Sequence, residues 1–96
     1  MRPVILTDVL AAARTLLAAP RPGWEALIAT ALDRAEIADR HRAATCALHP
    51  HWGNGSLHDA LASHVREPQR PLDDPLYLDA LILVLRTLRR RRAVRT

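Results

Sequence analysis

Apolar residues recur at helical spacing along most of the chain. The first predicted helix covers residues 8–18, and Thr7 stands before it as a residue type that caps helices. Its apolar face consists of Val9, Ala13, Leu16 and Leu17. The sequence Pro-Arg-Pro-Gly at 20–23 cannot continue a helix, so the first helix is expected to end before it.

A second, longer helix is predicted over residues 23–47. Its apolar stripe consists of Trp24, Leu27, Ile28, Ala31, Leu32, Ala35 and Ala38. A weaker apolar row lies off this stripe and comprises Ile37, Ala44 and Leu48. Two explanations of the weaker row are open. Either the distal half of the helix packs on a different neighbour, or the row is an exposed contact surface for a partner.

A short third helix is predicted over residues 57–65. Ser56 can accept the backbone N–H of Asp59, and Asp59 can reach back in the manner of a capping box. Its apolar positions are Leu57, Leu61 and Val65. Prolines 68 and 71 then enforce an irregular connector.

The last helix begins at Asp74-Pro75, because Asp caps helices and Pro suits the first helical position. Its apolar residues wrap most of the circumference: Leu76, Leu78, Leu81, Ile82, Leu83, Val84, Leu85 and Leu88. Such a helix is either the centre of a compact bundle or part of a self-association surface. We therefore expect an all-α, small four-helix domain over residues 1–88, with one long helix, a strongly apolar C-terminal helix and an Arg-rich tail over 89–96.

The composition agrees with a helical fold and argues against a strand-rich, disulfide-bonded or membrane-spanning protein. The 96 residues include 17 Ala and 16 Leu but no Phe, which favours helix over strand. The lone Cys46 permits no internal disulfide, and the apolar N-terminal run is interrupted by charged residues. The longest apolar run, 76–85, is about half the length that a bilayer requires. We expect a cytoplasmic protein with no membrane association.

Positive charge is concentrated at the C-terminal end. Residues 1–85 hold eight Arg and all ten acidic residues, whereas residues 86–96 hold six Arg and no acid. This end is either a solvated helix terminus, whose cations suit the helix dipole, or a site for nucleic-acid phosphates. The candidate nucleic-acid-binding residues are Arg86, Arg89, Arg90, Arg91, Arg92 and Arg95.

The stretch from His49 to Leu57 differs sharply from its Ala/Leu/Arg-rich surroundings. Its glycines suit a sharp reversal between two helices, and Trp52 can then cover one end of the bundle. The functional alternative is an interaction loop, because Trp and His are suited to interface centres. The candidate residues for that loop are His49, His51, Trp52, Asn54 and Ser56.

The spacing of the polar residues and of Cys46 gives little support to a catalytic or metal-binding site. Ser56, His58 and Asp59 are too close in sequence to converge as a hydrolytic triad. A zinc-dependent regulator or enzyme is the alternative function, with ligands drawn from Cys46, His49, His51 and His58, but their spacing matches no standard zinc motif. We predict no catalytic residue, no metal site and no cofactor.

Several segments carry a resemblance to a known family. They are Met1-Arg2-Pro3-Val4, Ala38-Asp39-Arg40, His49-Pro50-x-Trp52-Gly53-Asn54-Gly55-Ser56-Leu57 and Pro71-Leu72-Asp73-Asp74-Pro75-x-Tyr77-Leu78. Together they resemble a family of short uncharacterised helical proteins from GC-rich alphaproteobacteria, over nearly the whole chain. That resemblance implies no catalytic residues. A weaker resemblance is to the phage-like gene transfer agents of the same clade, where a small helical terminase subunit is the comparison.

These observations favour a non-enzymatic helical interaction module. We expect it to self-associate or to dock on a protein partner, with its Arg-rich end available for nucleic acid. A small terminase-like accessory of DNA packaging is one concrete form. No small-molecule substrate is inferred.

Overall fold

The computed structural model describes the backbone of residues 1–95 and the side chains of residues 1–93. Over this part of the chain it forms four α-helices: α1 (Leu6–Leu17), α2 (Trp24–Thr45), α3 (Leu57–Ala60) and α4 (Pro75–Arg95). A single 3-10 turn, η1 (Arg21–Gly23), precedes α2. The predicted all-α class with one long helix is confirmed.

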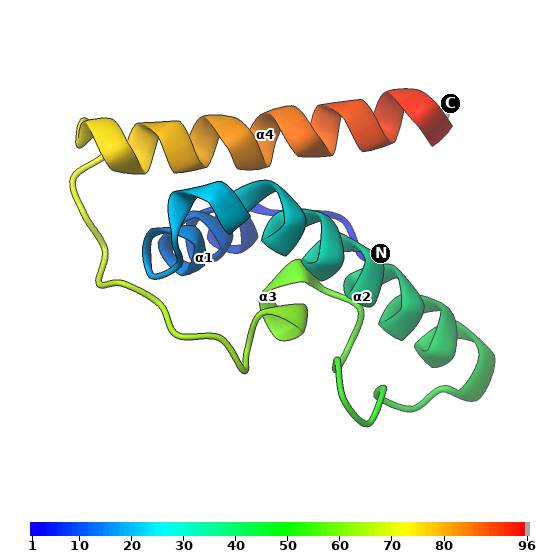
Figure 1. The fold of residues 1–96 in the computed structure, drawn as a ribbon. Coiled ribbons are helices and arrows are strands. Elements are labelled where there is room, and N and C mark those ends of the chain that lie inside the picture. The colour runs from blue at the N-terminus through cyan, green and yellow to red at the C-terminus, as the bar shows by residue number, and fades with distance from the viewer. Residues whose placement is uncertain (96) are drawn as a thin grey trace.

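Helix α1 occupies the centre of the bundle. It contacts α4 on one side and α3 on the other, and α2 packs beside it (Figure 1). Ala11, Ala12 and Ala13 are all buried, and their small side chains let neighbouring helices approach closely. The predicted apolar face of this helix is also buried, from Val9 to Leu17.

The first helix starts earlier than the sequence predicted. Its N-cap residue is Ile5, whose backbone N–H donates to Oδ2 of Asp8 at 3.0 Å. Thr7 lies within the first turn and is exposed, so the predicted Thr7 cap is wrong. Ile5 has no polar side chain of its own, so the hydrogen-bond acceptor at this helix start is the carboxylate of Asp8, inside the first turn.

The long helix buries its predicted stripe. Trp24, Ile28, Ala31, Leu32, Ala35 and Ala38 are buried, and Leu27 is half-buried. Ile37 and Leu48 are exposed, as is Ala44. The explanation that this weaker row packs on another neighbour is therefore wrong. The distal half of α2 extends past α1, so no helix of the described chain covers the row (Figure 1).

The third helix is shorter than predicted. Leu57 and Leu61 are buried, but α3 ends at Ala60 and Val65 is 79% exposed. After Leu61 the chain turns away to join the end of α1. There the Glu67 N–H donates to the Arg14 carbonyl at 3.1 Å, and Arg14 Nε donates to the Glu67 carbonyl at 2.8 Å. This tertiary pairing overrides the local helical pattern.

Helix α4 begins as predicted and lies along one side of the molecule. The Tyr77 N–H donates to Oδ1 of Asp74 at 3.0 Å, and Pro75 is the first helical residue. Its inner face, which includes Tyr77, Ala80 and Val84, is buried against the other helices. The alternative of α4 as the central helix is wrong, because α1 covers it from one side only (Figure 1). No helix within residues 1–95 has both the length and the hydropathy that crossing a membrane requires.

Candidate functional site

The loop between α2 and α3, residues 46–56 and called here the Trp52 loop, closes on itself. The His49 N–H donates to the Gly53 carbonyl at 2.9 Å, and the Gly53 N–H returns to the His49 carbonyl at 3.1 Å. Gly53 has a φ of +77°, which glycine adopts without strain. The predicted sharp reversal therefore lies where the glycines are.

Trp52 is held on its ring faces by neighbouring side chains. The His49 ring stacks on it, with centroids 4.6 Å apart and planes 6° apart. The Arg34 guanidinium of α2 lies 5.5 Å from the indole centroid, in cation–π contact. Trp52 is half-buried, so these contacts fix the loop against α2.

The imidazole of His49 acts as an acceptor inside the loop. Its Nδ1 accepts the backbone N–H groups of His51 and Trp52 at 3.1 and 3.2 Å. Desolvation of the ring, together with the nearby His41 and His51, lowers the pKa of His49 below 6.5. The neutral ring with a bare Nδ1 is therefore the form that this loop requires.

The remaining loop residues organise the start of α3. Ser56 Oγ accepts the Asp59 N–H at 3.1 Å, which confirms the predicted cap. Asp59 reaches back, as predicted, but its carboxylate accepts the Asn54 N–H at 3.0 Å rather than that of Ser56. The Ser56 N–H is instead bonded to Asn54 Oδ1 at 2.9 Å. His49, Trp52, Asn54 and Ser56 all have internal contacts that shape the loop, whereas His51 is exposed. An interaction role for this loop stays a prediction.

Two positions join the loop region to the rest of the bundle. Gly55 has a φ of +92°, and a Cβ placed there would lie 2.7 Å from the Cα of Asp39 in α2. Asp8 is buried in α1, and its Oδ1 accepts the His58 N–H of α3 at 3.1 Å. One carboxylate thus satisfies backbone donors at the starts of two helices. Sequence reasoning missed this role of Asp8, although an acid in the first helical turn is a usable signal.

The residues of the zinc alternative do not converge. Cys46 is exposed at the end of α2, and the His58 side chain contacts Arg66 and Asp59 instead. No three His, Cys, Asp or Glu residues among those that the structure describes form a group able to hold a metal ion. The arrangement gives no support to a metal centre.

The outward face of α4 carries an apolar row that no other part of the described chain covers. Leu78, Ile82 and Leu85 are 40%, 47% and 54% exposed and follow one another at spacings of four and three residues. We call these three residues the outer stripe. At helical spacing they fall on the opposite side of α4 from the buried residues Ala80 and Val84.

The predicted arginines fall into two groups. Arg91 is an internal clamp, because its guanidinium pairs with Asp33 at 2.9 Å and with Glu36 at 3.6 Å on α2. The exposed members are Arg86, Arg89, Arg90 and Arg92, called here the arginine cluster. They lie on the regular helix that continues α4, rather than on a separate extension. The side chain of Arg95 lies outside the described residues.

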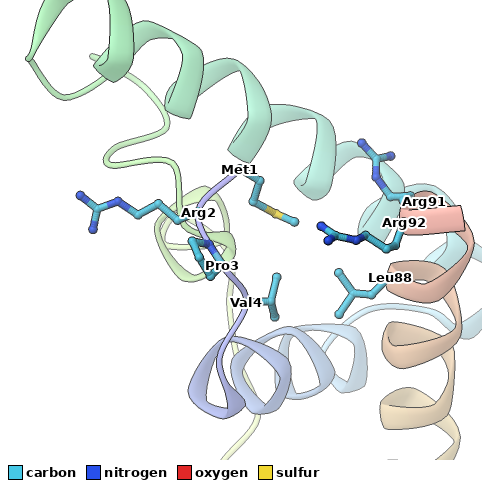
Figure 2. A pocket seen from close by; sticks show the side chains of 7 residues that line it. All are labelled: Met1, Arg2, Pro3, Val4, Leu88, Arg91 and Arg92. Atoms are coloured by element: carbon cyan, nitrogen blue, oxygen red, sulfur yellow. The ribbon is translucent and has the colours of Figure 1, made fainter. Parts of the chain in front are cut away.

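A groove separates the end of α4 from the N-terminal segment. It has a volume of about 250 Å³, and Val4 and Leu88 face each other across it (Figure 2). Arg92 turns its guanidinium toward this groove near Met1 (Figure 2). A second groove, of about 500 Å³, runs beside the outer stripe and includes Ile82 in its lining.

Sequence periodicity could not locate the outer stripe. It marked nearly all of α4 as apolar, and the positions of α1 and α2 against α4 decide which of those residues face outward.

Comparison with known proteins identifies a family but no individual matching protein. None of the curated proteins and none of the solved structures matches the chain. A family model described as Domain of unknown function (DUF7742) matches residues 2–88, and the chain therefore belongs to this family.

Proposed function

We propose that this domain is a non-enzymatic helical interaction module whose contact surface is the outer stripe of α4. The observation that carries the proposal is the exposure of Leu78, Ile82 and Leu85 in one row. Single exposed leucines are common on protein surfaces, but a row at helical spacing on one face is typical of a helix with a partner.

The exposure does not come from a loosely attached helix. The inner face of α4 buries Tyr77 and Val84 completely, and Asp74 caps its first turn. At the other end, Arg91 ties α4 to Asp33 on α2. The outer stripe is therefore presented by a helix held at both ends and along its inner side.

The surroundings of the stripe resemble a protein interface in composition. The groove beside it has Pro22, Ile82 and Leu83 among its apolar lining residues. Charged groups also line it: Arg21, Glu25, Asp79 and Arg86. An apolar centre with a charged rim is the usual anatomy of a protein–protein contact.

Photo-crosslinking in cells tests this proposal. A photoreactive phenylalanine analogue in place of Ile82 should yield a covalent adduct with a polypeptide on irradiation. The matched control carries the same analogue in place of Arg40, which is exposed on the distal half of α2. The proposal predicts adducts from position 82 and none of the same size from position 40. Folded protein that gives no adduct at position 82 would contradict it.

Nucleic-acid binding at the arginine cluster is a second proposed function. Four exposed guanidiniums within residues 86–92 are carried on two turns of one helix, and this density of cations suits a phosphate backbone. The described chain offers no exposed aromatic beside them for base stacking, since Trp24 is buried and Trp52 lies in the loop after α2. Binding is therefore expected to be independent of sequence.

The test of this second function is a titration of a duplex DNA with the protein at two salt concentrations. If all four cations contact phosphates, raising salt from about 50 to about 200 mM should weaken binding roughly 100-fold. Replacing Arg89, Arg90 and Arg92 by Gln should remove most of that salt dependence. Binding by this triple variant that equals that of the wild type would exclude the arginine cluster as the site.

A cytoplasmic, small terminase-like accessory of DNA packaging is one concrete form of the combined proposal. It would use an association surface and a basic end together, and it corresponds to the gene-transfer-agent resemblance. Capsid or packaging genes beside the gene for this chain would support this form, and their absence would remove its main support.

A further inference from the structure

We propose that the partner of the outer stripe is a second copy of this chain, with the two α4 helices antiparallel and facing each other at Ile82. This inference rests on the proposed function, because it names the occupant of the same surface. It follows from the distribution of apolar and charged residues along α4.

The outward side of α4 is divided into three zones. At its start, the preceding residues Asp73 and Asp74 bring negative charge, with Leu72 exposed beside them. The outer stripe forms the middle. At its end, Arg89 continues the same face, since it follows Leu85 at a spacing of four residues. Arg92 follows one turn later at the edge of that face, where its exposed side chain also borders the groove near Met1. The surface is thus acidic, apolar and basic in order.

Charge decides the orientation of a paired helix. In a parallel pair, Arg89 would face Arg89 and Arg92 would face Arg92, which places like charges together. In an antiparallel pair, the basic end of each copy meets the acidic end of the other. Like-charge contacts across an interface suppress the wrong arrangement, so the antiparallel pair is favoured.

Apolar contact decides the register. With Ile82 facing its own copy, the antiparallel relation brings Leu78 of one copy opposite Leu85–Arg86 of the other. The same register brings Arg89 opposite Pro75 and Arg92 opposite Leu72, one residue from Asp74 and Asp73 respectively. All three outer-stripe residues then lie inside the contact.

This arrangement also forms a closed dimer. A two-fold axis through Ile82 uses the same surface on both copies, so no free stripe remains to recruit a third. The acids at the α4 start already have some intramolecular partners, Arg70 for Asp74 and Arg21 for Asp79. Asp73 is exposed and adjacent to them, so we assign it as the main acceptor for Arg92 of the second copy.

Cysteine crosslinking tests orientation and register together. Facing helices with axes about 10 Å apart leave about 5 Å between facing Cα atoms, which a disulfide can span. In a Cys46→Gly background, which suits the left-handed backbone at that position (φ of +57°), single variants Leu78→Cys, Ile82→Cys and Leu85→Cys are oxidised separately and in pairs. The thiol-free background alone is the control.

The antiparallel pair predicts a specific pattern of crosslinks. Ile82→Cys should form a disulfide-linked dimer with itself. Leu78→Cys and Leu85→Cys should not, since their own copies lie about 9 to 12 Å away along the axis. A mixture of those two variants should give the mixed dimer. Self-crosslinking of all three variants would indicate a parallel pair and would overturn the inference.

The mass of the unoxidised background protein separates the remaining outcomes. A dimer without the predicted crosslinks would mean that the copies meet elsewhere. A monomer at all concentrations, together with a foreign adduct at position 82 in cells, would leave the proposed function standing and overturn the second copy as partner. A monomer with no adduct would overturn both.

A charge exchange tests the assigned ion pair. Asp73→Arg alone and Arg92→Asp alone should each weaken dimerisation roughly three- to tenfold, because each meets a like charge twice per dimer. The double variant should restore dimerisation, since the pair is rebuilt with reversed signs. Both residues are exposed, so folding should be unaffected. No recovery in the double variant would contradict the pairing.

Discussion

Ile82→Ala should separate the contribution of the outer stripe to association from its contribution to folding. Ile82 is 47% exposed on a helix whose opposite side is buried. If a second copy covers the stripe, the side chain loses its remaining exposure only in the dimer. The substitution therefore acts more strongly on association than on the stability of the folded monomer.

The magnitude follows from the exposed fraction. Complete burial of an isoleucine side chain contributes about 1.5–3 kcal/mol, so burial of the exposed half contributes about 1 kcal/mol per copy. A symmetric dimer loses this twice, and about 2 kcal/mol corresponds to a roughly 30-fold higher dimer dissociation constant. In the monomer the substitution removes the half of the side chain that is already buried, and the better helix propensity of alanine offsets part of that loss, so monomer stability should fall by less than about 1 kcal/mol.

Val84→Ala is the matched control on the same helix. Val84 is fully buried against the bundle, so its truncation removes two methyl groups from the core and leaves a cavity. It should destabilise the monomer by about 2 kcal/mol, which lowers the unfolding temperature by roughly 8–16 °C in a domain of this size. It does not remove any atom of the outer stripe.

The assay pairs sedimentation equilibrium with thermal unfolding of dilute protein. The expected result is a crossed pattern, in which Ile82→Ala changes the dimer dissociation constant and Val84→Ala changes the unfolding temperature. The reasoning is refuted if Ile82→Ala lowers the unfolding temperature of the monomer as much as Val84→Ala does. It is also refuted if Ile82→Ala leaves the dissociation constant unaltered.

Three further predictions concern the region around the Trp52 loop. Asp8→Ala should lower the free energy of unfolding by about 2–4 kcal/mol in a denaturant titration, because two backbone donors at helix starts lose their buried acceptor; a change below about 1 kcal/mol would contradict this role. Gly55→Ala should cost about 2–3 kcal/mol in the same titration, whereas Gly23→Ala, which meets nothing within 4 Å, should cost almost nothing; equal effects would count against the close approach. Acidification below pH 6.5 should unstack His49 from Trp52. The fold lowers the pKa of His49 and so favours its neutral form; the contribution of this ring to stability is complete above pH 6.5 and is lost as the pH falls toward the folded pKa. The difference in fluorescence between the wild type and Trp52→Phe should report the unstacking, and a pH-independent difference would refute it.

Helix positions were largely predictable from the sequence because their signals are local. The stripe from Trp24 to Ala38 and the Asp74-Pro75 start both follow from residue types at fixed spacings. The Ser56 cap is equally local. Each depends on contacts within about four residues, and a pattern along the chain carries that information.

The errors arose where distant residues determine the structure. The helix predicted over 57–65 ends early because Glu67 pairs with Arg14 on α1, a contact that no local pattern contains. The start of α1 is an exception, because its acceptor is local: Asp8 lies only three residues after Ile5, and the prediction chose Thr7 in its place. Which face of α4 remains exposed depends on where α1 packs, and the division of the arginines depends on the reach of Arg91 to α2.

The most direct test of the central claim is the mass of the wild-type protein in solution. The chain has a mass of 10.7 kDa. If two copies cover each other's outer stripe, sedimentation equilibrium should give twice that mass at high protein concentration, with a decrease toward the chain mass on dilution. A mass equal to that of a single chain at every concentration would contradict the claim that a second copy occupies the outer stripe.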